Sequence, residues 1–320
     1  MNPSETIHEM SSLPPLREGS RHLAWNGVSF TVPSNWEIAV FRSLRRGASR
    51  IELEDEYTLR MEAEWIFSQK GKLDTRTIIK RYEAASKPLT LKAEDQKEIT
   101  DLPEGWHATW FIFRETGKNK KAGQLEVIEH SLVTMFHICP DHSLFCFFLL
   151  HFMPEDPEVP VDIVRELAAG FKNNGRRAMI PWRLFDISFE LPRAFKLEHT
   201  HFDIGSKMMR FNWNFRQFHV WHFSCADMFL KDGQSPDRWL TGFLNAYGGF
   251  KGARFDPDGK GGITWRRRKP FLFGHRSEIA RWCFRYKIGW RLIEETRQLV
   301  VWVYHYRKRS DLAMLPEQFQ

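Results

Sequence analysis

The chain contains one sequence pattern twice. Residues 28–38 read VSFTVPSNWEI, and residues 187–197 read ISFELPRAFKL, with the same alternation of apolar positions and a proline at the same place. A strand-like stretch that ends in FLLHF at 148–152 has a counterpart, WVYHY, at 302–306. A repeat of this length is far too long for a solenoid, so each copy is predicted to be a domain.

The length of 320 residues agrees with two domains of ordinary size. We predict a polar N-terminal arm at 1–22, a first domain at 23–175, a linker at 176–182 and a second domain at 183–320. The first copy is acidic overall and the second is strongly basic, which gives the net charge of +7. Such an asymmetry indicates different partners for the two copies rather than different folds.

Composition and cysteine usage indicate a cytoplasmic protein. The N-terminus lacks the basic start and apolar segment of a secretory signal. The longest apolar run, at 144–152, is far shorter than the ~18 residues of a membrane helix, so we expect no membrane insertion. The four cysteines show no CxxC spacing, and we therefore expect reduced thiols with neither a disulfide framework nor a zinc site.

In the first copy, apolar and polar residues alternate as in strands that bury one face. The predicted strands lie at 28–32, around 51–53, and at 59–65, 106–113, 126–139 and 144–152. One predicted helix begins at Asp74 and buries Ile78, Ile79, Tyr82 and Ala85. A second begins at Pro160 and buries Ile163, Val164, Leu167, Ala168 and Phe171.

The second copy repeats this order. Its helix begins at Ser235-Pro236-Asp237, a strong cap followed by proline, and buries Trp239, Leu240, Phe243 and Tyr247. Consecutive strands joined by short turns favour antiparallel pairing. The predicted fold class is therefore α+β, with two tandem copies of an antiparallel sheet packed with helices, as in an α/β/α sandwich.

The opening strand and its turn, GVSFTVPSNW at 27–36, resemble the start of PsbP-like domains. This fold group includes the photosystem subunit PsbP, a Ran-GTPase release factor, DcrB lipoproteins and the Eag adaptor chaperones of type VI secretion. The second copy departs from the pattern, since Phe195 stands in place of the tryptophan. The resemblance implies a domain that acts by binding other proteins, in a bacterial cytoplasmic adaptor with no cofactor.

The last strands of the second copy carry the strongest candidate for a binding surface. Between 280 and 291 aromatic and aliphatic residues alternate with cations, so a continuous strand would place the cations on one face. The run WRRRK at 265–269 lies just upstream and could extend that face if the two strands are neighbours. The predicted binding residues are Arg266, Arg268, Arg281, Arg285, Lys287 and Arg291. A solvated face with no ligand is an equally simple interpretation.

Other chemistries have weaker support. His199, His201 and Asp203 could share a face, but two histidines do not complete a metal site. His219 and His222 do not share one. His151 and His305 recur at equivalent positions, which favours a structural role. The sequence contains no G-x-S-x-G and no phosphate-binding loop.

We therefore predict a non-enzymatic adaptor or assembly protein that binds a partner with an acidic surface through the second domain. One alternative is a binder of nucleic acid or of another anionic ligand through the same face, although no RNA- or DNA-binding signature is present. Another is an enzyme or metal protein with a site between the domains.

Overall fold

The computed structural model describes residues 18–316 and 319, apart from a set of short segments. These gaps are 44–47, 69–75, 77–79, 81, 83–91, 119–124, 142, 185–186, 231–234, 269–275 and 284. The chain divides into two compact units. The N-terminal unit contains residues 1–176 and 181–186, and the C-terminal unit contains 177–180 and 187–320.

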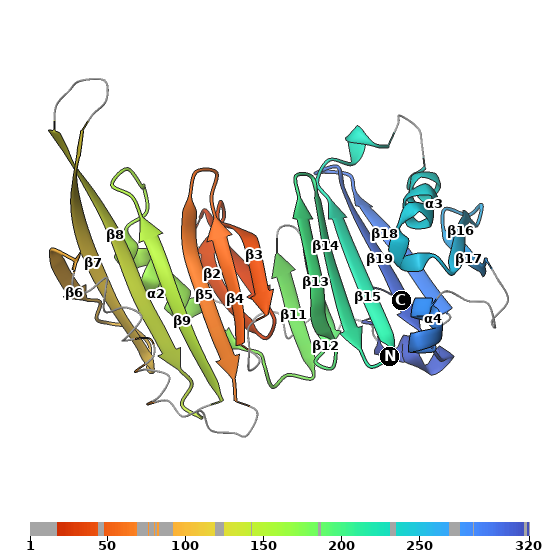
Figure 1. The fold of residues 1–320 in the computed structure, drawn as a ribbon, viewed down its shortest axis with the longest axis horizontal. Coiled ribbons are helices and arrows are strands. Elements are labelled where there is room, and N and C mark those ends of the chain that lie inside the picture. Colours follow the sequence, from red (N-terminus) through yellow and green to blue (C-terminus); the bar gives the residue numbers. More distant parts are fainter. Residues whose placement is uncertain are drawn as a thin grey trace, which may run out of the picture. The chain divides into compact units, whose positions relative to one another are not determined.

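The N-terminal unit is built on a seven-stranded antiparallel sheet (Figure 1). In the order of the sheet its strands are β3 (Glu37–Ser43), β4 (Ala48–Glu54), β5 (Leu59–Phe67), β9 (Leu144–Phe152), β8 (Leu125–Ile138), β7 (Trp106–Lys118) and β6 (Asp95–Glu98). The central strands are rich in apolar residues, and Phe148 and Leu150 of β9 are fully buried. Such long alternating strands need a cover over their apolar face.

Part of that cover is a second, smaller sheet. Within this unit, that sheet contains β10 (Lys172–Asn173), β2 (Val28–Pro33), β1 (Ser20–Trp25) and the end of β11 (Met179–Leu184), in that order. Every residue of β2 is buried, and Phe30 meets Phe148 edge to face at 5.6 Å. A turn through Asn26 (φ 44°) and Gly27 (φ 91°) joins β1 to β2. Asparagine and glycine suit this position because a two-residue hairpin turn of this type needs positive φ at both residues.

Helix α2 (Pro160–Gly170) packs against β2 at the side of this smaller sheet. It buries Ile163, Val164, Leu167 and Ala168, as its periodicity predicts. Gly170 is required by close approach, since a Cβ there would lie 2.3 Å from the hydroxyl of Thr31. The helix therefore closes one side of the core and does not cover the whole sheet.

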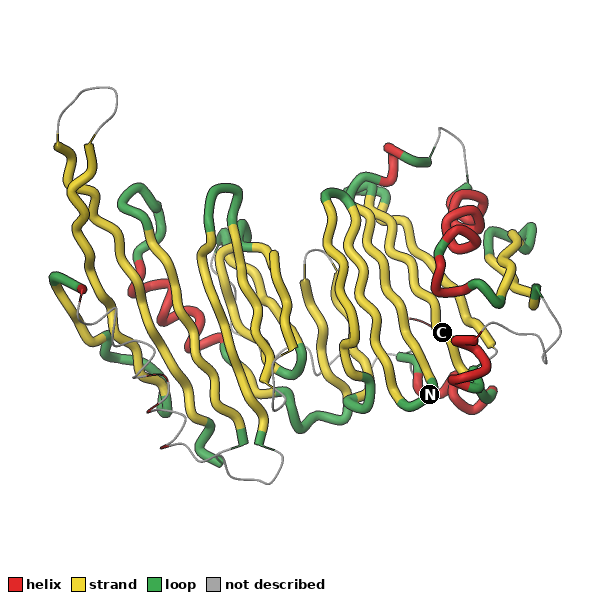
Figure 2. The backbone as a smooth tube through the Cα atoms, in the orientation of Figure 1, coloured by secondary structure: helices red, strands yellow, loops and turns green. Residues whose placement is uncertain are grey.

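The C-terminal unit is built on a five-stranded antiparallel sheet (Figure 2). In the order of the sheet its strands are β13 (Lys196–Asp203), β14 (Ser206–Trp213), β15 (Arg216–Phe223), β19 (Gln298–Tyr306) and β18 (Arg285–Ile293). One face packs under β12 (Ile187–Pro192), whose Phe189 contacts Phe211 and Phe218. The opposite face carries the other core of the unit, with Trp221 and Val301 among its buried residues.

That second core is covered by a helix and a hairpin. Helix α3 (Pro236–Ala246) packs against β16 (Ala253–Pro257), which pairs only with β17 (Ile263–Arg267) among the described strands. Four shorter helices complete the described unit. They are η2 (Ala226–Met228), η3 (Gly248–Phe250), α4 (Arg276–Arg281) and η5 (Arg309–Met314).

The two units share one strand order. β3-β4-β5-β9-β8 in the N-terminal unit corresponds, strand for strand, to β13-β14-β15-β19-β18 in the C-terminal unit. The units differ in the segment before the last two strands. In the N-terminal unit β6 and β7 extend the large sheet, whereas β16 and β17 form a separate sheet of two strands.

The predicted α+β class with helices packed on the sheets is wrong. The described residues form a β-rich fold of four mostly antiparallel sheets with few helices. The physical reason is that strands cover a face of each large sheet where helices are predicted. These strands are β1 and β2 in the N-terminal unit and β12 in the C-terminal unit. The described helices are short, and α2 and α3 cover only part of a face.

Two predicted boundaries differ from the observed elements, and most of the helix predicted after Asp74 lies outside the described residues. The predicted arm at 1–22 includes the start of β1 at Ser20, while residues 1–17 lie outside the described residues. The predicted linker at 176–182 contains the start of β11. Of the predicted helix after Asp74, the described residues include helical Tyr82, whose ring stacks on Phe147 at 4.3 Å.

The helices in the described part of the chain are too short or too polar to cross a membrane.

Candidate functional site

The structure separates the six predicted binding residues into three places. Arg266 lies on β17 and Arg268 directly after it, Arg281 ends α4, and Arg285, Lys287 and Arg291 lie on β18. The sheet that contains β17 is not hydrogen-bonded to β18, so the two strands do not extend a common face. The proposed continuous basic face is therefore not formed.

The strand predicted from 280 begins only at Arg285. The preceding residues form α4, and Trp282 follows the helix with φ of 53°. Arg285, Lys287 and Arg291 do share one face of β18, because they are separated by two and four residues along a continuous strand. Arg285 and Arg291 are exposed near opposite ends of the strand, and Lys287 is half-buried.

A pocket of about 480 Å³ lies over the β16–β17 hairpin and the end of α3. Its lining residues are Asn245, Arg254, Arg266, Arg267 and Arg268. Two of them, Arg266 and Arg268, are among the residues predicted from the sequence. Sequence reasoning missed the other three because it took β17 as a neighbour of β18 and did not place α3 beside the hairpin.

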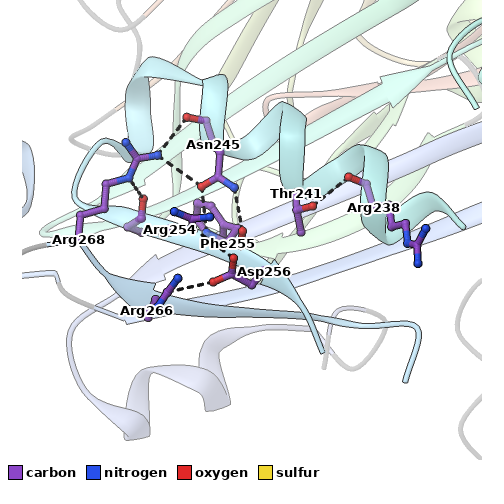
Figure 3. A network of polar contacts seen from close by, with 9 residues as sticks. Arg238, Thr241, Asn245, Arg254, Phe255, Asp256, Arg266 and Arg268 are labelled. Carbon is purple, nitrogen blue, oxygen red and sulfur yellow. Dashed lines mark hydrogen bonds and ion pairs between the residues drawn. The ribbon is translucent and has the colours of Figure 1, made fainter. Parts of the chain in front are cut away.

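Asn245, in the last turn of α3, fixes the helix to the hairpin. Its side-chain amide donates to the carbonyl oxygen of Phe255 at 2.7 Å and accepts from the NH of the same residue at 3.0 Å (Figure 3). This bidentate contact satisfies both backbone groups of Phe255. Because Phe255 is buried, the contact also holds β16 at a fixed height above the core.

Arg268 is held at the rim of the pocket by backbone and side-chain acceptors. Its Nε donates to the carbonyl oxygen of Ala253 at 2.8 Å, and its Nη2 lies 3.3 Å from the Asn245 carbonyl oxygen. Nη2 is also 3.4 Å from Oδ1 of Asn245. The acceptors are uncharged, so they orient the guanidinium group without neutralising its charge.

Arg254 and Arg266 share one carboxylate. They are direct partners across the hairpin, and their Nε atoms lie 3.3 Å and 3.1 Å from the two oxygens of Asp256. Figure 3 shows Arg266 directed toward this carboxylate. Both arginines are more than half exposed, so these pairs orient the side chains more than they stabilise the fold.

The hairpin packs on aromatic residues of the core. Trp265 meets Tyr286 at 5.2 Å, and the hydroxyl of Tyr286 donates to Oε1 of buried Glu278 at 2.7 Å. Burial, followed by the nearby charge of Glu278, raises the pKa of Tyr286 far above its usual range. Tyr286 therefore stays a neutral donor at every physiological pH.

The histidines singled out in the sequence do not assemble a site in the described residues. His201 contacts Asp203 at 2.7 Å, but both side chains are exposed. Among the described residues there is no group of three or more His, Cys, Asp or Glu side chains that could hold a metal ion. His219 and His222 are both buried in β15, and Nε2 of His222 lies 3.2 Å from Oε1 of Gln298.

The recurring histidines contact different partners. Nε2 of His151 lies 3.2 Å from Oε1 of Glu62 on the neighbouring strand, and this hydrogen bond is the main reason why the pKa of Glu62 is lowered. His305 stacks on Tyr286 at 4.5 Å and bonds to the carbonyl oxygen of Cys283. Both arrangements tie a central strand to its surroundings.

No protein-family model matches the chain, and a comparison with curated proteins gives no significant match.

Proposed function

We propose that the protein is a non-enzymatic adaptor, and that the arginine pocket of its C-terminal unit binds an acidic segment of another protein. The observation that carries this proposal is the charge of the pocket. Four arginines line it, and Asp256 is the carboxylate that contacts two of them. A pocket with this excess of positive charge attracts a ligand that brings carboxylates of its own.

The arginines have hydrogen-bonding capacity left for such a ligand. Among the described residues, the contacts of Arg254 and Arg266 with Asp256 use their Nε atoms, and both side chains are more than half exposed. A carboxylate accepts two parallel hydrogen bonds from a guanidinium group. Glutamate or aspartate side chains are therefore well matched to this pocket.

The pocket is also preorganised. Asn245 holds the helix to the hairpin, and Arg268 is fixed by two carbonyl oxygens before any ligand arrives. Preorganised donors lose less conformational entropy on binding, so more of the interaction free energy appears as affinity.

Nucleic acid is a weaker candidate for this pocket. Single-stranded nucleic acid is held by cations together with exposed aromatic rings on which bases stack. The aromatic residues of the hairpin, Phe255 and Trp265, instead pack against the core beneath it. The pocket thus offers cations without a stacking platform, which favours an acidic protein segment.

Two further parts of the sequence-based prediction belong to this proposal. We place the protein in the cytoplasm, where its free thiols stay reduced. Residues 27–36 resemble PsbP-like domains, which act by binding other proteins, and this resemblance supports a protein-binding role.

The proposal can be tested with defined peptides. We would measure fluorescence anisotropy of a labelled oligoglutamate peptide, and of an oligoglutamine peptide of equal length, with the full chain. We expect binding of the glutamate peptide alone, weakened by added salt. Replacing both Arg254 and Arg266 with serine should weaken it at least about tenfold, the effect of losing two charge-assisted contacts.

The matched control is Arg238→Ser. Arg238 is exposed on the same helix that carries Asn245 but does not line the pocket, so this variant should change the affinity less than about twofold, as expected for a charge outside the site. Equal effects of the pocket and control variants would contradict the proposal. If a DNA oligonucleotide binds more tightly than the glutamate peptide and the pocket variant loses this binding, the pocket is a nucleic-acid site instead.

A further inference from the structure

One end of the five-stranded sheet in the C-terminal unit gathers exposed apolar side chains and cations. Three segments meet there, namely the β14–β15 turn, the end of α4 and the residues that follow β19. Figure 1 shows α4 near the start of β15, at the end of the sheet opposite to the β13–β14 turn. We refer to Phe215, Ile279, Trp282, Arg285 and Arg307 together as the sheet-end surface.

Direct contacts link the three segments. The thiol of Cys283, next to Trp282, donates to the carbonyl oxygen of Phe215 in the β14–β15 turn. The guanidinium group of Arg307 lies 5.6 Å from the centre of the Trp282 ring, a cation–π distance. The surface is therefore assembled by the fold from residues that are far apart in the sequence.

Trp282 adopts a backbone conformation that is unfavourable for a large side chain. Its φ is 53°, and its NH bonds to the carbonyl oxygen of Ile279 at 3.2 Å, so it occupies the position after the helix where glycine is usual. Trp282 is nevertheless 56% exposed and gains little from burial in the core. A strained residue that does not serve packing points to a function for its side chain.

The neighbouring apolar side chains are exposed as well. Phe215 is 46% and Ile279 is 44% exposed. Around them are the exposed cations Arg285, Arg307, Lys308 and Arg309. None of the ion pairs within the described residues involves these four cations, whereas the nearby carboxylate of Asp311 is paired with Arg216 at 2.6 Å.

We propose that the sheet-end surface docks onto the headgroup region of an anionic lipid bilayer, with Trp282 as its anchor. Tryptophan favours the boundary between headgroups and hydrocarbon, where its amphipathic ring is half-buried. Phenylalanine and isoleucine side chains add apolar area to the same shallow contact. Each cation near an anionic lipid surface strengthens adsorption about fivefold.

The residues favour lipid over the other anionic partners. One face of the Trp282 ring is already covered by Arg307, and Ile279 has no ring, so the surface is a poor platform for stacked bases. The exposed apolar residues lie in the β14–β15 turn and at the end of α4, among the loops at this end of the sheet. Docking of this kind is peripheral and requires no membrane-spanning segment. It also involves residues other than the arginine pocket.

The test is sedimentation of the full chain with vesicles. One set consists of phosphatidylcholine alone, and the other of equal amounts of phosphatidylcholine and phosphatidylserine. We expect binding to the anionic vesicles and little to the neutral ones. Trp282→Gly should reduce binding to the anionic vesicles at least tenfold, with a melting temperature equal to or higher than that of the wild type, because glycine relieves the positive φ.

The matched control is Ile204→Ser. Ile204 is fully exposed in the β13–β14 turn, at the other end of β14, and its replacement should leave vesicle binding unchanged. If Trp282→Gly lowers the melting temperature, Trp282→Asn, which also tolerates positive φ, provides a second variant. Wild-type-like binding by a folded Trp282 variant would overturn the proposal. So would equal binding to both vesicle types, no binding to either, or preferential binding of a single-stranded oligonucleotide that Trp282→Gly abolishes.

Discussion

Arg254 and Arg266 face each other across the β16–β17 hairpin and reach the two oxygens of a single carboxylate, that of Asp256. Two guanidinium groups side by side repel each other, and the carboxylate between them reduces that repulsion. Their arrangement holds both side chains in place while one negative charge offsets only one of the two positive charges. The pocket therefore keeps its positive potential.

Removing this carboxylate should strengthen anion binding. In Asp256→Asn the pocket gains one unit of positive charge, and we expect the oligoglutamate peptide to bind up to about fivefold more tightly, the size of an exposed ion-pair contribution. The melting temperature should fall slightly. Anisotropy titrations at low and moderate salt measure the change. Weaker binding by this variant would mean that Asp256 acts chiefly by orienting the arginines.

Asn245 should matter for stability more than its position at a helix end suggests. Asn245→Ala leaves both backbone groups of buried Phe255 without their partners, at an expected cost of about 1–3 kcal/mol in the free energy of unfolding. Urea denaturation followed by tryptophan fluorescence measures it. Asn245→Asp keeps an acceptor for the Phe255 NH but loses the donor, so it should be destabilised as well. A neutral effect of both variants would contradict the assigned role.

The N-terminal unit should lose stability in acid through Asp55. Burial alone would raise the pKa of Asp55, but the NH groups of Tyr57 and Thr58, together with buried Arg60, outweigh burial and lower it. Arg60 also bonds to Asp156 and so ties two loops together. A carboxyl group with a depressed folded pKa stabilises the fold above its unfolded value, about 3.9, and this contribution is lost as the pH falls through the folded pKa.

We therefore expect the free energy of unfolding to decrease below about pH 4, and to decrease less steeply in Asp55→Asn, which has no titrating group at that position. Urea denaturation across this pH range provides the measurement. An equally steep decrease in the variant would show that other carboxyl groups dominate the acid response.

One cysteine should react with thiol reagents in the folded protein. Cys225 is exposed, whereas Cys139, Cys146 and Cys283 are buried. Burial also raises the pKa of the Cys139 and Cys146 thiols, which keeps them protonated and unreactive. Titration with a chromogenic disulfide should give one thiol per native chain, and none with Cys225→Ser. Four thiols should appear after denaturation. Rapid labelling of further thiols in the native state would contradict this exposure pattern.

Much of the strand content could be predicted because alternation is a local property. The strands around 106–113, 126–139 and 144–152 and the helix from Pro160 are all present. The missed strand β1 had a local signal too, since Asn26-Gly27 is the strongest short hairpin turn. Reading that turn would have joined 20–25 to 28–33 and predicted the second β layer that makes the fold β-rich.

The strand predicted between 280 and 291 shows the limit of alternation. Only its first two residues, Ala280 and Arg281, lie in α4, and the strand begins at Arg285. The bond of Cys283 to Phe215 and the cation–π contact of Trp282 with Arg307 occur at the turn that separates α4 from β18. Both are long-range contacts, which periodicity does not encode.

The sequence by itself determined that the chain holds two similar copies, where most strands run and which segment is rich in arginine, because repetition, alternation and charge are properties of neighbouring residues. Only the tertiary structure decided which arginines act together. β17 pairs with β16, which is held by Asn245 of α3, so Arg254, Arg267 and Arg268 join Arg266, while Arg307 lies with Trp282. These groupings arise from hydrogen bonds and packing between distant segments, which stabilise one arrangement among many that the local pattern allows.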